Sequence, residues 1–452
     1  MTTKILSTQS YSLKNEIFKA LKLSYPIVIA QLGIIAMGVA DTMMVGQIGA
    51  TELAAASLGN GIHFLVVCIG IGLTSVISPM IAQANAQKNY TLVSKILGAG
   101  FYVSFILSSM ILIAHTFLTY FIFSLGQEIE VAKFAQSYLY IVSLGVFPLV
   151  LFLAARNFTD GLSYTKIAMY VTFGGLLINI FLNWLLIFGN LGFPRWGLFG
   201  AGLATVITRI LMMLSIFWYI FSQKKFKIYL SNFDFWRVDR LLVNKIYRLG
   251  FPAGLQYFFE IGCFSVAALM SGWLGKYPLA SHQVVINLAS VTYMVTTGIG
   301  TAGAILVAEG VGQKNKKYIF RSAMIVLILA ALFMIFASVL FLIFQKFWVG
   351  LYSSDEKVLA IAMNLLLIAC LFQLSDGIQC IGLSILKGIE DVKIPTMITL
   401  IAYWVIGLPS GYILGFNFNL GVYGIWYGLS LGLTFSAVFL TIRFFYLYKR
   451  KF

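Results

Sequence analysis

Charged side chains are scarce in this sequence. Asp, Glu, Lys and Arg make up only 10% of its 452 residues, while 60% are hydrophobic; an average soluble domain has about 25% charged residues. This shortage excludes an ordinary soluble domain and predicts an integral membrane protein. The apolar runs of about 20 residues contain Gly, Ser and Pro, which favours membrane-spanning helices over the alternating pattern of a β-barrel.

Cysteine and histidine are also sparse, and neither has the spacing of a disulfide framework or a metal site. The four cysteines lie in apolar segments without paired spacing, which argues against disulfides and metal sites: Cys68, Cys263, Cys370 and Cys380. There is no HExxH motif, and the three histidines form no ligand-spaced set: His63, His115 and His282. We therefore expect a protein that is not an enzyme and uses no cofactor.

The basic residues are in excess, with a formal net charge of +16. In a soluble protein this charge would suggest nucleic acid as a partner. Here the cations lie in short loops between apolar runs, where they interact with anionic lipid and orient helices in the membrane. We expect membrane lipids, and no nucleic acid, among the partners.

The apolar runs between polar breaks predict twelve membrane-spanning helices. Their expected ranges are 23–45, 54–80, 97–122, 134–154, 167–189, 198–221, 249–271, 283–308, 322–344, 358–384, 395–415 and 422–446. The loops on one side of these spans carry 25 Lys and Arg residues, Lys4 among them, and the loops on the other side carry 5. The positive-inside rule then places both termini and the long central loop in the cytoplasm. The chain starts with a polar, basic segment that leads directly into a full-length span, so we expect no cleavable signal peptide.

The second half of the chain repeats the first at an offset of 226 residues. The sequence KLSYP at 22–26 returns as RLGFP at 248–252, and QKN at 87–89 returns at 313–315. Two units of six helices enter the membrane from the same side, so they are parallel repeats related by a pseudo-twofold axis along the membrane normal. We expect a first bundle over 1–221, a cytoplasmic linker over 222–247 and a second bundle over 248–452.

Many secondary transporters are duplicated in this way, with a central cleft between two bundles that rock between two open states. A duplicated bundle with a structural role is the alternative. Intramembrane charges argue against that alternative, because an ionised group at the bilayer centre costs about 3 kcal/mol and is usually functional. Four charged residues lie deepest in apolar surroundings: Asp41, Arg209, Glu260 and Asp376.

Glu260 and Asp376 are the buried carboxylates of the second half. If they face one pocket, desolvation and mutual repulsion favour a bound proton or cation over two bare charges. We interpret the pair as a coupling site for Na⁺ or H⁺. An ion pair with Arg209 is the alternative, which its position in the other half disfavours.

Asp41 is the deepest carboxylate of the first half. Asn179 and Asn183 lie four residues apart on one helix and share a face, and Thr205 brings a hydroxyl group at a similar depth. One carboxylate with neutral oxygen ligands suits a monovalent cation, or a proton shared with amides. Hydrogen bonding between helices is the alternative for the amides and the hydroxyl group, but it does not account for Asp41.

Tyr293 lies in an apolar run of the second half. Its ring offers a π-face to an organic cation, with plain packing as the alternative.

At these residues the sequence resembles the multidrug and toxic compound extrusion (MATE) family, in particular its bacterial NorM-like branch. The resemblance covers essentially the whole chain. Beside the twelve helices in two repeats, it rests on Pro26 and Asp41 in the first helix, Pro252 and Glu260 in the seventh and Asp376 in the tenth. It implies an all-α membrane protein of the MATE/MOP-type fold, with two six-helix repeats around a central cleft, in the bacterial inner membrane.

The family is described as antiporters that export organic cations and other amphipathic compounds in exchange for Na⁺ or H⁺. The resemblance therefore implies drugs as substrates and a monomeric transporter. It assigns Glu260 and Asp376 to the cation site of the second half, and Gln283 and Tyr293 to the drug cleft. The polar site of the first half is assigned to Asp41, Asn179, Asn183 and Thr205.

One position departs from the family pattern. Phe372 stands where related members have a tyrosine, one turn before the aspartate of the tenth helix. This removes an oxygen ligand that Na⁺ would use, so the choice between Na⁺ and H⁺ stays open. The alternative function is a flippase for lipid-linked precursors in the same superfamily, for which additional helices and several intramembrane basic residues would be expected.

Overall fold

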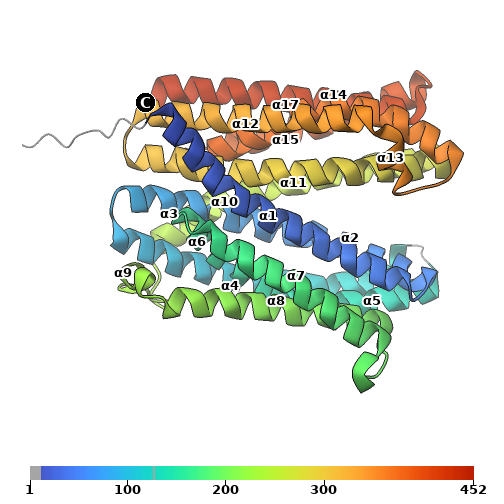
Figure 1. The fold of residues 1–452 in the computed structure, drawn as a ribbon, viewed down its shortest axis with the longest axis horizontal. Helices are drawn as coiled ribbons and strands as arrows, with labels where there is room; N and C mark the ends of the chain where they lie inside the picture. Colours follow the sequence, from blue (N-terminus) through green and yellow to red (C-terminus); the bar gives the residue numbers. More distant parts are fainter. Residues whose placement is uncertain (1–11, 126–127) are drawn as a thin grey trace, which may run out of the picture.

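The computed structural model describes residues 12–125 and 128–452, and every regular element in these ranges is helical (Figure 1). Lys4, which entered the charge count, lies outside the described residues. The first half contains α1 (Leu13–Gly46), α2 (Ala50–Ser75), α3 (Ile77–Ala86), α4 (Tyr90–Phe121), η1 (Ile122–Leu125), α5 (Ile129–Leu144), α6 (Val146–Gly161), α7 (Thr165–Phe188), η2 (Asn190–Gly192) and α8 (Gly197–Ser222).

The linker carries η3 (Lys224–Phe226) and α9 (Lys227–Leu230). The second half contains α10 (Arg240–Trp273), α11 (Lys276–Gly312), α12 (Lys316–Ile343), α13 (Gln345–Gly350), α14 (Glu356–Gly388), α15 (Lys393–Leu400), η4 (Ile401–Gly407), α16 (Leu408–Tyr412), η5 (Ile413–Asn417) and α17 (Gly421–Lys451).

Eleven helical segments of the described chain are long and apolar enough to cross a membrane, and the bent pair α5 and α6 supplies a twelfth. The prediction of an all-α membrane fold with twelve spans is confirmed. Lipid-facing surfaces are evident on single helices: Ile328, Leu332 and Phe336 recur every four residues of α12 and are 57–60% exposed. Such an apolar stripe is stable only where hydrocarbon covers it.

The fourth span is broken, in contrast to the single helix that we predicted. In place of one helix over 134–154, α5 and α6 meet at Gly145 with a bend of 41°. Pro148, in the first turn of α6, has no N–H to bond the carbonyl group of Leu144, so the helix cannot continue unbroken. A Cβ atom on residue 145 would lie 3.1 Å from Arg209 Cδ, so glycine also makes room for the arginine.

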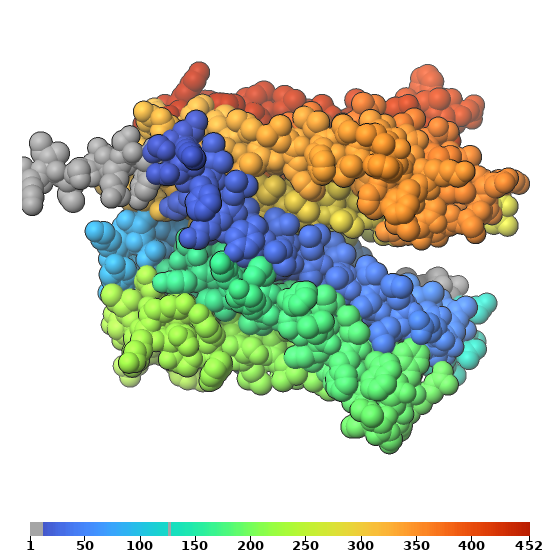
Figure 2. Space-filling model, in the orientation of Figure 1, coloured from blue at the N-terminus to red at the C-terminus, as the bar shows by residue number. Residues whose placement is uncertain are grey.

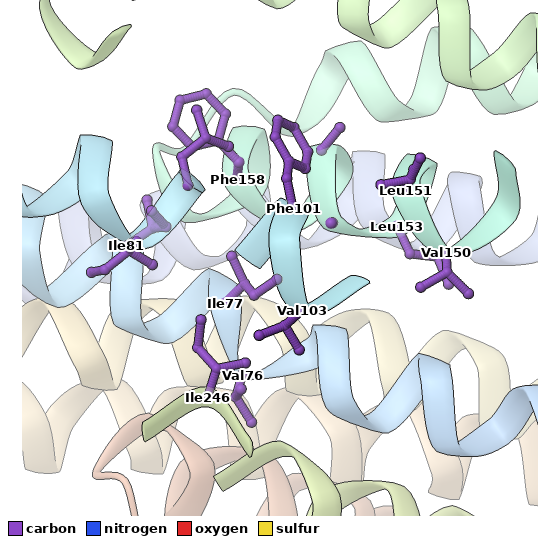
Figure 3. Packing of buried hydrophobic residues seen from close by; sticks show 14 of the residues in the cluster. Val76, Ile77, Ile81, Phe101, Val103, Val150, Leu151, Leu153, Phe158 and Ile246 are labelled. Carbon is purple, nitrogen blue, oxygen red and sulfur yellow. The ribbon is translucent and has the colours of Figure 1, made fainter. Parts of the chain in front are cut away.

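Each half takes part of its hydrophobic core from the first helix of the other half. In the cluster of Figure 3, Ile77, Phe101 and Phe158 pack together with Ile246 of α10. The second-half cluster includes Ala20, Leu23 and Ile27, which lie on α1. The starts of α1 and α10 therefore join the halves at the end of the molecule where α9 and the C-terminus lie (Figure 1), which we call the linker end.

Close helix contacts between the halves lie on both sides of the pseudo-twofold axis. A Cβ atom on Gly72 of α2 would overlap the backbone of Gly254 on α10, and one on Gly298 of α11 would lie 2.6 Å from Cγ2 of Val28 on α1. The two pairs are related by the 226-residue offset. Figure 2 shows the halves in contact at the linker end and separated by a groove at the opposite end, which we call the open end.

Polar contacts also cross between the halves at the linker end. Lys19 Nζ lies 2.7 Å from Glu309 Oε1, and Arg321 Nη1 lies 3.5 Å from Glu16 Oε1. The pair of Lys19 with Glu309 is partly exposed, and such ion pairs contribute about 0–1 kcal/mol each. In the second pair Arg321 is partly exposed, whereas Glu16 is buried.

Gly72 provides a test of this packing. Gly72→Ala should destabilise the described state by about 1–3 kcal/mol, because the added methyl group forces the α2 and α10 backbones apart. Thermal unfolding of the detergent-solubilised protein measures the loss. Gly61→Ala on the same helix is the control: its Cβ would meet no atom within 4 Å, so stability should hold or rise slightly. Equal losses in the two variants would contradict the packing argument.

Candidate ion and substrate site

Two carboxylates are buried in the second half. Glu260 on α10 is 7% exposed and Asp376 on α14 is 5% exposed. Tyr293 of α11 is the one described side chain that hydrogen-bonds either of them, donating from its hydroxyl group to Glu260 Oε2 at 3.2 Å. A single neutral donor does not offset two buried negative charges, so the pair is suited to hold a proton or a cation.

Tyr403 and Gln379 extend this polar group, and the sequence reasoning missed both. Gln379 lies three residues after Asp376 on the same face of α14 and donates its Nε2 to the Tyr403 hydroxyl group. Tyr403 is fully buried in η4, a stretch of widened π-helical turns, which are frequent at functional sites. The spacing of Gln379 from Asp376 was the available signal; nothing in the sequence around Tyr403 marked it.

Phe372 supplies no oxygen to the pair. It is 2% exposed and packs its ring 5.4 Å from that of Trp426 on α17. Trp426 in turn donates its indole N–H to His282 Nδ1 at 3.1 Å. The residue that departs from the family pattern is thus part of an aromatic core layer, one helical turn before Asp376 on α14.

A narrow cavity of about 60 Å³ joins the two halves beside Glu260. Its walls include Glu260 and Tyr293 from the second half and Gln31, Ser75 and Asn157 from the first. Residues of both halves therefore lie close enough to Glu260 to be affected by its charge. Asp376 does not line this cavity.

Gln283 lies apart from this group. It is exposed on α11, ten residues before Tyr293, which is about 15 Å along a helix. The structure thus does not bring together the two residues that the resemblance assigned to one drug cleft. Any ligand that touched both would have to extend along α11 toward the open end.

The polar residues of the first half meet around Asp41. Asn183 Nδ2 donates to Asp41 Oδ1 at 2.5 Å, and the Thr205 hydroxyl group lies 3.3 Å from Asp41 Oδ2. Asn183 Nδ2 also lies 3.3 Å from Asn179 Oδ1. The four residues, from α1, α7 and α8, form one connected network. Asn179 Nδ2 and Asn183 Oδ1 are buried without a partner in the described chain, so the network has unused hydrogen-bonding capacity.

Arg209 continues the network one turn further along α8. Its Nη1 donates to His63 Nε2 at 3.1 Å, and the rings of His63 and His115 lie 5.1 Å apart. His63 must be neutral at this atom to accept from a guanidinium group. The alternative of an ion pair between Arg209 and the carboxylates of the second half is wrong, because Arg209 belongs to the first-half cluster.

The expectation of only four deep charges is also wrong. Arg156 and Asp160 of α6 are 5% and 1% exposed, and Arg156 Nε lies 3.4 Å from Asp160 Oδ2. The charge count assigned Arg156 to a loop, because an i, i+4 pair at a helix end looks the same in sequence whether it is buried or solvated. Glu16 is a further buried carboxylate, at the linker end.

The arrangement as a whole suits monovalent ions or protons. Within the described residues, no cluster of three or more His, Cys, Asp or Glu side chains is placed to hold a metal ion. Carboxylate, hydroxyl and amide oxygens dominate both polar groups, and these are ligands of hard cations.

Comparison with known proteins agrees with this architecture. The MatE family model matches the chain twice, at residues 26–185 and 252–413. The chain belongs to the MATE family. The two matches start 226 residues apart, the same offset as the internal repeat, and the resemblance predicted from the sequence is confirmed.

Several bacterial MATE proteins are similar over nearly the full length. Multidrug resistance protein NorM of Aliivibrio fischeri is 33% identical over 96% of each chain, and NorM of Vibrio cholerae is 34% identical over 97% of each chain. Multidrug resistance protein MdtK of Proteus mirabilis is 33% identical over 95% of each chain.

Solved MATE structures share the fold. The eukaryotic MATE transporter AtDTX14 superposes with a TM-score of 0.89 at 19% identity over 96% of each chain. A multidrug resistance MATE family transporter in an outward-facing conformation superposes with a TM-score of 0.87 at 20% identity, covering 95% of this chain and 96% of the other. At these identities the likeness concerns the fold alone.

Proposed function

We propose that this MATE protein exports organic cations and other amphipathic compounds from the bacterial cytoplasm by antiport against Na⁺ or H⁺. The observation that carries the proposal is the position of Glu260. It is a buried carboxylate with one neutral hydrogen-bond donor, in the wall of a cavity that both halves line. Relatives named as multidrug resistance proteins support drugs as the substrate class.

Coupling follows from competition for this charge. A ligand shifts a conformational equilibrium only by its differential affinity for the two states. A proton or Na⁺ on Glu260 and Asp376 removes the negative charge that attracts an organic cation, so ion entry and drug release favour the same state. One charge that moves through 100 mV supplies about 2.3 kcal/mol, enough for accumulation of tens-fold.

The proposed alternating access depends on the difference between the closed linker end and the open end. If the linker is cytoplasmic, the described state is closed inward at the linker end and open outward. The opposite state requires the contacts of Gly72 with Gly254, and of Lys19 with Glu309, to separate. We propose that the halves rock as bodies about the region between these contacts and the open end.

The flippase remains the alternative function. A lipid pyrophosphate would need several basic residues inside the membrane. The cavity beside Glu260 has one cation in its wall, Lys387, whose Nζ donates to Ser75 Oγ at 2.9 Å. A single lysine that is already bonded across the halves favours a cationic substrate over an anionic one.

The proposed orientation has both termini and the linker in the cytoplasm of the inner membrane, and the protein acts as a monomer. A cysteine at Ser231, exposed next to α9, should resist an impermeant thiol reagent in intact cells and react after permeabilisation. The background lacks the four native cysteines. A cysteine at Lys276, exposed at the start of α11, is the control and should react from outside. The reversed labelling pattern would overturn the orientation.

The carboxylate pair is tested by Glu260→Gln and Asp376→Asn. Each variant should reduce gradient-driven export from proteoliposomes by about tens-fold, because the amide keeps the volume but removes the charge that binds the ion. The two losses should be non-additive, since either change disables one shared site. Thermal stability should hold or rise, because an uncompensated buried charge is removed.

Separately imposed Na⁺ and H⁺ gradients in the same assay identify the coupling ion. Glu130→Gln, an exposed carboxylate of α5, is the control and should transport normally. Asp41→Asn should slow export without the same change in ion dependence if it belongs to a separate site. A double variant at 260 and 376 that exports at the normal rate, with unaltered ion dependence, would refute the assignment.

A further inference from the structure

A second and larger cavity lies at the linker end, away from the carboxylates. Its volume is about 810 Å³, and it is a partly open cavity lined by the starts of α1 and α7, the end of α8 and the first residues of the linker. Figure 1 shows these segments at the same end of the molecule as the C-terminus. Neither the ion site nor the groove at the open end accounts for it.

The walls of this cavity are basic. Among the residues that the structure describes, four lysines line it and no Asp or Glu does: Lys19, Lys22, Lys166 and Lys225. Lys19 is paired with Glu309, whereas the other three have no carboxylate partner within the described residues. Like charges gathered around a concave surface repel one another unless an anion occupies it. The cavity is therefore electrostatically suited to an anionic ligand.

Hydrogen-bond donors point to the same class of ligand. The 24-residue helix α7 begins at Thr165, and its N-cap residue Tyr164 makes no side-chain capping bond. The start of a helix leaves free N–H groups and a partial positive charge, which together bind phosphate groups well. Ser163 and Ser215 add hydroxyl groups to the wall.

Lys225 is held in place without a carboxylate partner among the described residues. Its Nζ donates to the Tyr219 hydroxyl group at 2.8 Å and lies 4.3 Å from the ring centroid of Tyr164, a cation–π contact. These two aromatic neighbours fix the ammonium group at the cavity wall without neutralising its positive charge. A lysine that is ordered in advance loses less conformational entropy when it binds an anion.

The rim of the cavity faces the lipid surface of the protein. Tyr170 of α7 and Trp218 of α8 are 66% and 72% exposed, and exposed tyrosine and tryptophan are typical of the membrane interface. Beyond them, Leu177 of α7 and Leu214 of α8 continue the same faces at helical spacing and are 55% and 52% exposed. An apolar surface thus leads from the basic cavity toward the membrane centre.

We propose that this cavity binds the phosphate group of an anionic phospholipid, whose acyl chains lie along the exposed faces of α7 and α8. The lysines and the start of α7 recognise the phosphate. The aromatic rim and the apolar stripes select a lipid over a soluble phosphate ester, because only a lipid covers both surfaces. The ligand also bridges α1 to α7 and α8 at the end where the halves are joined.

The test compares lipids by thermal unfolding of the purified full-length protein in detergent. Phosphatidylglycerol should raise the unfolding temperature more than phosphatidylcholine does. The triple variant Lys22→Gln/Lys166→Gln/Lys225→Gln should weaken the apparent affinity for phosphatidylglycerol by about tenfold or more, since each lysine near an anionic surface contributes about a factor of five. Its unfolding temperature without added lipid should change little.

The control has the same charge change at exposed lysines outside the cavity: Lys314→Gln/Lys317→Gln/Lys449→Gln. It should keep the response to phosphatidylglycerol. Equal loss in both triple variants would overturn the proposal in favour of non-specific charge attraction. If the triple variant does not fold, Lys166→Gln alone, at an exposed position, should still weaken the response more than Lys317→Gln alone does.

Glycerol phosphate and inorganic phosphate are tested in the same assay. Neither should stabilise the protein at concentrations at which phosphatidylglycerol does. Stabilisation by either to the same extent, abolished by the cavity variant, would show that the site takes soluble phosphates and would overturn the lipid assignment. Because the readout is lipid-dependent stability, it does not depend on transport, and its failure would leave the proposed antiport untouched.

Discussion

Glu260 is a carboxylate buried between two bundles, and it forms no ion pair with a Lys or Arg of the described residues. The hydroxyl group of Tyr293 is its one hydrogen-bond donor among the described side chains. In a low-dielectric site such a charge is too costly to leave bare. A bound proton or cation would remove this cost. Under the proposed antiport, binding of that ion is linked to the relative position of the two halves.

The linker end, where the two halves are in contact, is held closed by tight packing between helices. Glycines let α2 approach α10 closely, and Gly298 does the same for α11 and α1 on the other side of the pseudo-twofold axis. Packing of this kind is either made or broken, because cores do not deform continuously. Weak ion pairs such as Lys19 with Glu309 add orientation without making the contact permanent. Under the proposed antiport, a change of charge in the adjacent cavity shifts the equilibrium between this closely packed state and the opposite state.

Sequence reasoning predicted the parts of this structure that depend on local chemistry. Apolar length gave the twelve spans, and the four-residue spacing of Asn179 and Asn183 placed both amides on the face that meets Asp41. It failed for contacts that depend on packing between segments far apart in the sequence. The contact of Arg209 with His63 joins residues 146 positions apart, and no local pattern indicates it. The same holds for Tyr403, whose hydroxyl group finds Gln379 only through the widened turns of η4.

The most direct test of the account is whether the ion state of Glu260 controls the open end. Spin labels at Gln47, after α1, and Lys276, at the start of α11, are exposed positions on opposite halves. Their distance distribution can be measured by double electron–electron resonance in a background without native cysteines. The account predicts that changing Na⁺ concentration or pH shifts this distribution in the unmodified site, and that Glu260→Gln abolishes the shift. The account would be contradicted if the distance distribution did not change with Na⁺ concentration or pH, or if it changed equally in Glu260→Gln.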